Sequence, residues 1–305
     1  MKISRREFLG KSAAAAGMAT VAASAGDVLA HQKFTGYPDA LGLLIDTTRC
    51  IGCRSCEAAC NKVNELPPPA VPFDDGSVFE EKRRTDSATY TVVNRYEDQE
   101  SENAPVFRKI QCMHCQEPAC ASACFVGAFK KTPEGAVLYN PDVCIGCRYC
   151  MVACPFGVPA YEYDNAYTPE VTKCTLCYER IKEGLSTACA EACPTGAIQF
   201  GRREDLLKIA RQRIQAYPER YVDHIYGEHE AGGTGCLYLA GAEFENLDLP
   251  ENIQDAPYGL LTRGFLSAVP LVLVLWPALL GGFYILTKRG KDTDTPSGDK
   301  GATNV

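Results

Sequence analysis

The chain has few basic residues. It contains 31 Lys and Arg against 38 Asp and Glu, so its formal net charge is −7. It also lacks any basic stretch with interleaved aromatic residues. Because nucleic-acid-binding proteins need a basic surface to neutralise phosphate, these two absences argue against nucleic acid as a partner.

Charged residues of either sign are missing from Gly264 to Thr287, a run of 24 residues. About 20 apolar residues suffice to cross a bilayer, so this run predicts a transmembrane helix over 264–287. A buried core helix is the alternative. The run ends at Lys288 and Arg289, and the positive-inside rule therefore predicts a cytoplasmic tail over 288–305. The rest of the chain would then lie on the other side of the membrane, anchored by its C-terminus.

Cysteine, by contrast, is abundant. Sixteen of the seventeen cysteines form four groups of four. The groups are Cys50, Cys53, Cys56 and Cys60; Cys112, Cys115, Cys120 and Cys124; Cys144, Cys147, Cys150 and Cys154; and Cys174, Cys177, Cys189 and Cys193. The first and third groups have the C-x2-C-x2-C-x3-C spacing of bacterial ferredoxins, whose thiolates hold 4Fe–4S clusters. The spacing therefore predicts four 4Fe–4S clusters with these sixteen cysteines as ligands.

Two other uses of cysteine are alternatives. An exported protein can carry a disulfide framework, and paired CxxC units can hold structural zinc. Disulfide frameworks do not usually repeat one four-cysteine spacing, and zinc sites use two CxxC pairs rather than a CxxCxxC triplet. The repeated spacing favours iron–sulfur clusters. Four thiolates would complete the coordination of each cluster, so no position stays open for catalysis, and the pattern predicts a non-catalytic electron-transfer protein.

The chain repeats itself, and the repeats predict how the groups combine. Cys50-Ile-Gly-Cys-Arg recurs as Cys144-Ile-Gly-Cys-Arg, and Cys120-Ala-x-Ala-Cys recurs as Cys189-Ala-x-Ala-Cys. In two-cluster ferredoxins, three cysteines of a run bind one cluster and the fourth binds the other. The predicted sets are set I, with Cys50, Cys53, Cys56 and Cys193; set II, with Cys112, Cys115, Cys120 and Cys154; set III, with Cys144, Cys147, Cys150 and Cys124; and set IV, with Cys174, Cys177, Cys189 and Cys60.

The second and third groups are close in sequence. Residues 125–143 between them read as a short strand, a Pro-Glu-Gly turn and a second strand, the usual link inside a two-cluster ferredoxin. The first and fourth groups flank this unit and should complete another. The predicted fold is α+β, with two ferredoxin-like two-cluster units, one nested within the other, over 31–203 and an insertion at about 61–104. An extension over 204–260 is predicted to pack on this body, because 203–216 has apolar residues at helical spacing.

The N-terminus reads as an export signal. Ser4-Arg5-Arg6-Glu7-Phe8-Leu9 is a twin-arginine motif, and an alanine-rich stretch and the small residues Val28-Leu29-Ala30 follow it. An ordinary amphipathic helix or a Sec signal is the alternative. The twin-arginine route carries folded proteins, so clusters built in the cytoplasm would survive export. Residues 1–30 are therefore predicted to be a signal peptide.

Four residues near the groups have open roles. Arg54 and Arg148 lie beside predicted ligands and could either tune the cluster potentials or be solvated charges. His114, between two ligands of set II, is expected to donate a hydrogen bond to sulfur or to be exposed. Cys236, outside every group, is expected to be a buried small apolar residue.

The cysteine groups and the residues around them resemble the four-cluster iron–sulfur beta subunits of membrane oxidoreductases, such as formate dehydrogenase, dimethyl sulfoxide reductase and polysulfide reductase. That resemblance covers about residues 40–200. Two later segments are similar to the HybA-type subunits of membrane-bound hydrogenase-2, as are the twin-arginine start and the C-terminal apolar run. These segments are Ile225-Tyr-Gly-Glu-His-Glu-Ala-Gly-Gly-Thr234 and Phe244-Glu-Asn-Leu-Asp-Leu-Pro250.

The resemblance implies electron transfer between a periplasmic nickel–iron hydrogenase, with its small and large subunits, and a multi-span membrane subunit that reacts with quinone. The family's cluster ligands would correspond to the sixteen cysteines. The same module serves formate dehydrogenase and other molybdenum or tungsten membrane oxidoreductases, which is the alternative. A third hypothesis is a membrane-tethered zinc-binding scaffold without redox activity. The expected location is the periplasmic side of the bacterial inner membrane.

Overall fold

The computed structural model describes residues 37, 39–97 and 105–293, with side chains in the last helix described at 258–261, 268, 269 and 271–285. The predicted signal at 1–30 and the predicted tail from 294 onwards lie outside the described residues. The described residues up to Leu261 belong to one compact unit, which contains all the cysteines. The chain from Thr262 onwards belongs to a second unit, and the two are described separately.

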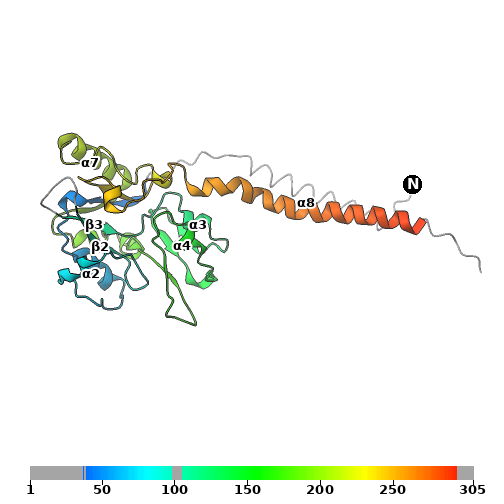
Figure 1. The fold of residues 1–305 in the computed structure, drawn as a ribbon, viewed down its shortest axis with the longest axis horizontal. Coiled ribbons are helices and arrows are strands. Elements are labelled where there is room, and N and C mark those ends of the chain that lie inside the picture. Colours follow the sequence, from blue (N-terminus) through cyan, green and yellow to red (C-terminus); the bar gives the residue numbers. More distant parts are fainter. Residues whose placement is uncertain (1–36, 38, 98–104, 294–305) are drawn as a thin grey trace, which may run out of the picture. The chain divides into compact units, whose positions relative to one another are not determined.

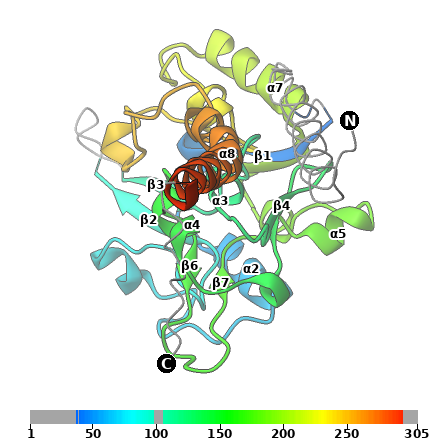
Figure 2. The ribbon, with the colours of Figure 1, turned by 90° about the vertical axis from the view of Figure 1, so that its right-hand side faces the viewer.

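A three-stranded sheet joins the beginning of the first unit to its later part (Figure 2). The central strand β1 (Leu41–Asp46) pairs antiparallel with β8 (Ile198–Arg202) and parallel with β9 (Cys236–Leu239). Leu43 is opposite Phe200 on one side and Cys236 on the other. Strand β1 reads Leu-Gly-Leu-Leu-Ile without polar alternation because both of its faces are buried.

Helix α7 (Arg203–Ala216) packs on this sheet (Figure 1). Its buried residues recur at helical spacing and meet the apolar residues of β1 and β9. The resulting cluster contains Leu206, Leu207, Ala210 and Ile214 of the helix and Leu44, Leu237 and Leu239 of the strands. The amphipathic helix predicted over 203–216 is confirmed.

Three antiparallel two-stranded ribbons complete the β structure. They are β2 (Val92–Tyr96) with β3 (Val106–Ile110), β4 (Phe129–Lys131) with β5 (Val137–Tyr139), and β6 (Ala160–Tyr161) with β7 (Val171–Thr172). The β4–β5 ribbon is the predicted link between the second and third groups. Gly135 in its turn has φ of +104°, a conformation that glycine adopts without strain, so this strand–turn–strand prediction is confirmed.

Short helices contain or directly follow cysteines of all four groups. They are α2 (Ser55–Val63), α3 (Ala119–Ser122), α4 (Tyr149–Ala153), α5 (Tyr178–Lys182) and α6 (Ala188–Glu191). Single 3-10 turns are η1 (Thr47–Arg49), η2 (Gly76–Glu80), η3 (Pro141–Val143), η4 (Glu230–Gly232) and η5 (Glu245–Leu247). Helix α2 packs against α6, and α3 packs against α4. The first cysteine group therefore neighbours the fourth, and the second neighbours the third.

The described residues of the second unit belong to helix α8. This helix runs from Tyr258 to Thr293, so it begins before and ends after the predicted span at 264–287. Its described side chains from Leu271 to Ile285 are all exposed. Among residues whose side chains are described, no helix has the length and apolar character needed to cross a membrane.

Candidate metal centres

The loop that carries the first three cysteines of set I is shaped by its backbone. Gly52 has φ of +70° and Arg54 has φ of +56°, both in the left-handed region. A Cβ on Gly52 would lie 2.5 Å from the ring of Phe107, so the position requires glycine. Helix α2 begins directly after Arg54, and Cys56 and Cys60 then share one face of that helix.

Sets I and IV each line a cavity. Cys50, Cys53 and Cys56 surround the first cavity together with Cys193 from the fourth group. Cys174, Cys177 and Cys189 surround the second together with Cys60 from the first group. Each cavity therefore receives three cysteines from one group and a single cysteine from the other.

Sets II and III are also brought together. Burial raises the pKa of Cys115, and the thiolates of Cys112, Cys154 and Cys120, the rest of set II, raise it further. Burial raises the pKa of Cys150 to about 11, together with the thiolates of Cys144, Cys147 and Cys124, the rest of set III. Within each of the four sets, the structure thus places the four cysteines near one another. Their role as iron ligands stays a prediction.

The thiols have surroundings that fit a 4Fe–4S cluster. Burial raises the pKa of Cys174 to about 12, so a free thiol there keeps its proton and a metal must displace it. Backbone N–H groups also reach sulfur atoms, and such hydrogen bonds help to set cluster potentials. The bonds are Gly146 N to Cys144 Sγ at 3.4 Å, Leu176 N to Cys174 Sγ at 3.4 Å, and Ala128 N to Cys124 Sγ at 3.2 Å. In the described part of the chain, no three His, Cys, Asp or Glu side chains converge as a site for one metal ion.

Lys109 in β3 lies between sets I and IV. It lines both cavities and is only 2% exposed. Burial acts to lower its pKa, but the thiolates of Cys189, Cys56 and other members of these sets outweigh burial and raise it. Lys109 was not predicted from the sequence, where it stands next to Arg108 in the segment Val106–Ile110 just before the second cysteine group.

His114 differs from both predicted roles. Its side chain is fully buried, so the exposed alternative is wrong. The ring Nδ1 accepts a hydrogen bond from Val137 N at 3.0 Å, and no bond from the ring to sulfur is found among the described residues. Burial holds the pKa of the imidazole well below its usual range, so the ring is neutral. His114 therefore ties the set II loop to strand β5.

Cys236 is buried, as predicted, and is completely inaccessible. Its thiol donates to the carbonyl of Cys112 at 3.3 Å and accepts from Nε2 of Gln111 at 3.3 Å. Burial is the main cause that raises the pKa of the Cys236 thiol, and the thiolates of Cys174 and Cys112 raise it further. Cys236 therefore lies where sets II and IV meet.

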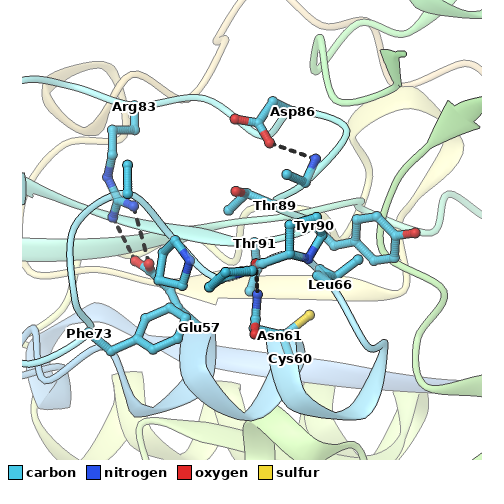
Figure 3. A pocket seen from close by; sticks show the side chains of 15 residues that line it. Glu57, Cys60, Asn61, Leu66, Phe73, Arg83, Asp86, Thr89, Tyr90 and Thr91 are labelled. Carbon is cyan, nitrogen blue, oxygen red and sulfur yellow. Dashed lines mark hydrogen bonds and ion pairs between the residues drawn. The ribbon is translucent and has the colours of Figure 1, made fainter. Parts of the chain in front are cut away.

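Arg54 is not a solvated charge, because it is only 2% exposed. Its guanidinium pairs with Glu57 and donates to the carbonyls of Pro72 and Asp75 at 2.6 and 3.2 Å. Glu57 also pairs with Arg83 at 2.7 Å, as Figure 3 shows.

Arg148, the counterpart of Arg54 in the third group, is exposed. Its guanidinium lies over the rings of Tyr161 and Tyr163, at 5.5 and 5.7 Å from their centroids. The two repeated arginines thus have opposite environments.

The pocket in Figure 3 belongs to the insertion. It lies between α2 and the segment from Leu66 to Thr91, and Cys60 is its only lining residue from the sixteen cysteines. Asn61 holds one edge by donating to the Pro67 carbonyl at 2.7 Å. The pocket borders set IV and contains no set of its own.

Comparison with known proteins identifies the family. The 4Fe-4S dicluster domain family matches residues 104–203. A protein of Nitratidesulfovibrio vulgaris is 52% identical over 287 residues, covering 93% of this chain and 77% of its own length. The hydrogenase-2 operon protein HybA of Escherichia coli O157:H7 is 34% identical over 325 residues, covering 97% of this chain and 98% of its own. The nitrate-inducible formate dehydrogenase iron-sulfur subunit of Escherichia coli K12 is 34% identical over 225 residues, covering 72% and 74%. The chain therefore belongs to the family of HybA-type 4Fe–4S electron-transfer subunits.

Proposed function

We propose that this chain relays electrons through four 4Fe–4S clusters between a periplasmic nickel–iron hydrogenase and a quinone-reactive membrane subunit. Similarity to the hydrogenase-2 operon protein extends over 97% of the chain, against 72% for the formate dehydrogenase subunit. This wider match favours a hydrogenase as the catalytic partner. The alternative is the beta subunit of a formate dehydrogenase or another molybdenum or tungsten membrane oxidoreductase.

The proposal rests on one observation: the four sets of cysteines follow one another as neighbours, in a row. Sets I and IV are adjacent, as the lining of both cavities by the same residue, Lys109, indicates. Sets IV and II meet at Cys236, whose thiol is close to Cys174 and Cys112. Sets II and III share one apolar cluster, which contains Cys120 and Cys150. The order along the row is therefore I, IV, II, III.

The two ends of this row reach the surface. Cys53 of set I and Cys147 of set III are exposed, whereas all other cysteines are buried or half-buried. When bound, 4Fe–4S clusters supply one-electron redox chemistry. The chain encloses the middle of the row and leaves an end open on each side, which suits transfer between two separate partners.

The location follows from the two ends of the sequence. The twin-arginine motif at Ser4–Leu9 directs a folded, cofactor-loaded protein to the periplasm. The 24 uncharged residues of 264–287, followed by Lys288 and Arg289, would anchor it in the inner membrane with a cytoplasmic tail. The exposed apolar side chains of α8 between Leu271 and Ile285 support this anchor.

Replacing Cys147 with Ser tests the relay. We expect electron transfer from hydrogen to quinone to fall to a small fraction of normal, because one end of the row loses a ligand. Hydrogen oxidation with an artificial dye should persist, since the catalytic subunit can reduce the dye directly. Cys236→Ser is the matched control, because it changes a cysteine outside all sets, and both activities should be retained. Equal loss of both activities in a fully assembled Cys147→Ser complex would contradict the relay.

Metal analysis separates the remaining hypotheses. Anaerobically purified protein should contain about sixteen irons with equivalent acid-labile sulfide, as four clusters require. Zinc with little sulfide would instead support the scaffold hypothesis. Identifying the catalytic subunit that co-purifies with this chain distinguishes a hydrogenase from a molybdenum or tungsten oxidoreductase. Deletion of the chain after residue 260 should release the complex from membranes unless its partners carry anchors of their own.

A further inference from the structure

Lys109 is the one residue that the linings of the set I and set IV cavities share. Strand β3 holds its backbone rigidly between two neighbours. Lys109 is opposite Val93 in β2, and its carbonyl accepts a hydrogen bond from the Tyr238 hydroxyl at 2.7 Å. The side chain is 2% exposed. The ammonium group is therefore fixed between two sets of four thiols.

A buried ammonium is costly unless opposite charge surrounds it. The ion pairs of the described residues include none between Lys109 and a carboxylate. Opposite charge would come instead from the cysteines as thiolate ligands of bound clusters, because Cys56 and Cys60 of α2 and Cys174 and Cys189 all lie near the ammonium group. Because both sets contribute, the same positive charge acts on both of them.

The chain contains its own comparison at the other junction. Val171 precedes Cys174 by three residues, as Lys109 precedes Cys112, and both residues lie in the second strand of an antiparallel ribbon. Val171 is 2% exposed and packs in the cluster that contains Cys120 and Cys150. A valine thus occupies the strand position beside sets II and III that a lysine occupies between sets I and IV. The positive charges near set II come from other positions: Lys131 is close to Cys115 and Cys112, and Lys173, which is buried, is close to Cys120.

We propose that the single positive charge of Lys109 acts on the clusters of both set I and set IV. Each electron added to a cluster increases its negative charge, and a nearby fixed cation favours that change. Lys109 therefore raises the reduction potential of both clusters and lessens the repulsion between them when both are reduced. Val171 carries no charge, so no cation shared in this way lies at that strand position, and Lys131 and Lys173 act on set II from other positions. This inference rests on the proposed function, because it assumes clusters in these four sets.

The test is an anaerobic redox titration of the assembled complex, followed by paramagnetic resonance. Cys53→Ser and Cys147→Ser assign signals to sets I and III by removing one ligand from each. In Lys109→Met we expect the reduction equilibrium constants of the set I and set IV clusters to fall at least tenfold, or 59 mV for one electron. Those of sets II and III should change less than threefold. Lys109→Arg keeps the charge and should restore all four to within threefold of the wild type.

Lys130→Met is the matched control, because it removes one exposed positive charge from β4. It should leave all four equilibrium constants within threefold. Unchanged constants in Lys109→Met, or equal shifts of all four clusters, would overturn the inference. If Lys109→Met loses iron, Lys109→Gln replaces it. Loss of iron in both variants with recovery in Lys109→Arg would assign Lys109 to cluster retention and also overturn the inference. Absence of four clusters in the wild type would instead refute the proposed function.

Discussion

The first and third cysteine groups are close copies that the protein surrounds differently. Both carry Cys-Ile-Gly-Cys-Arg, and their backbones match. Gly52 and Gly146 both have φ of +70°, and Arg54 and Arg148 have φ of +56° and +59°. A repeated local sequence has therefore produced a repeated local backbone, because Gly and the αL arginine leave the loop one compact path.

The difference lies outside the repeat. The insertion after the first group covers Arg54 with the carbonyls of Pro72 and Asp75. It also brings Arg83 to Glu57 (Figure 3). Within the part of the chain that the structure describes, Arg148 has no such cover; it is exposed and lies over the rings of Tyr161 and Tyr163. The comparison teaches that a cysteine motif determines how thiols are presented, whereas distant segments determine the charge and water around them.

Among the variants that test this difference, we expect replacement of Glu57 to reduce stability the most. Its carboxylate accepts from Arg54, from Arg83 and from the N–H of Val93, and its side chain is 1% exposed. Glu57→Ala leaves buried positive charge unpaired and should cost about 3–5 kcal/mol. The equivalent residue in the third group is Met151, which is half-buried. Met151→Ala should cost only about 1–2 kcal/mol.

The measurement for this pair is the midpoint of anaerobic urea unfolding on samples with matched iron content. Similar losses in the two variants would show that the Glu57 network does not stabilise the first group specifically.

Replacing the two arginines with glycine comes next in size. Glycine accepts positive φ at both positions, so backbone strain does not confuse the result. Arg54→Gly removes the donors to Glu57, Pro72 and Asp75 and should cost about 2–4 kcal/mol. Arg148→Gly loses only the contacts with the two tyrosine rings and should change stability by about 1 kcal/mol or less. The measurement is the thermal unfolding midpoint of each variant. Equal shifts of the two midpoints would contradict the difference between the two arginines.

Substituting alanine at the two glycines sharpens the comparison further. Both changes place a Cβ at φ of +70°, which costs about 1–2 kcal/mol. In Gly52→Ala the new Cβ also meets the Phe107 ring at 2.5 Å, whereas in Gly146→Ala it meets the Tyr161 hydroxyl at 3.1 Å. We expect Gly52→Ala to be the more destabilising by a further ~1–2 kcal/mol, because the packed ring must move. Unfolding midpoints test the order, and a larger loss in Gly146→Ala would refute it.

Much of the site could be predicted from the cysteine spacing. A two-residue gap and a repeated run are local properties, so the four cysteine groups, the β4–β5 ribbon and helix α7 could be predicted from nearby residues. The division into sets came from the ligand exchange of two-cluster ferredoxins. The roles of Lys109 and Arg54 were not, since each depends on a strand or loop that arrives from elsewhere in the chain. His114 was misjudged for the same reason, because Val137 N reaches it from the next ribbon.

The nested arrangement also constrains how a ribosome can make this protein. The cysteines of sets II and III all lie between Cys112 and Cys154, so this inner pair of sets is translated in full before the outer pair. The outer pair needs Cys193, and strand β1 waits for β8 and β9 before its sheet is complete. Chains emerge from the N-terminus first, so the thiols from Cys50 to Cys60 are the first to be translated and among the last to be completed. The earliest thiols would therefore wait for their partner cysteines through most of translation.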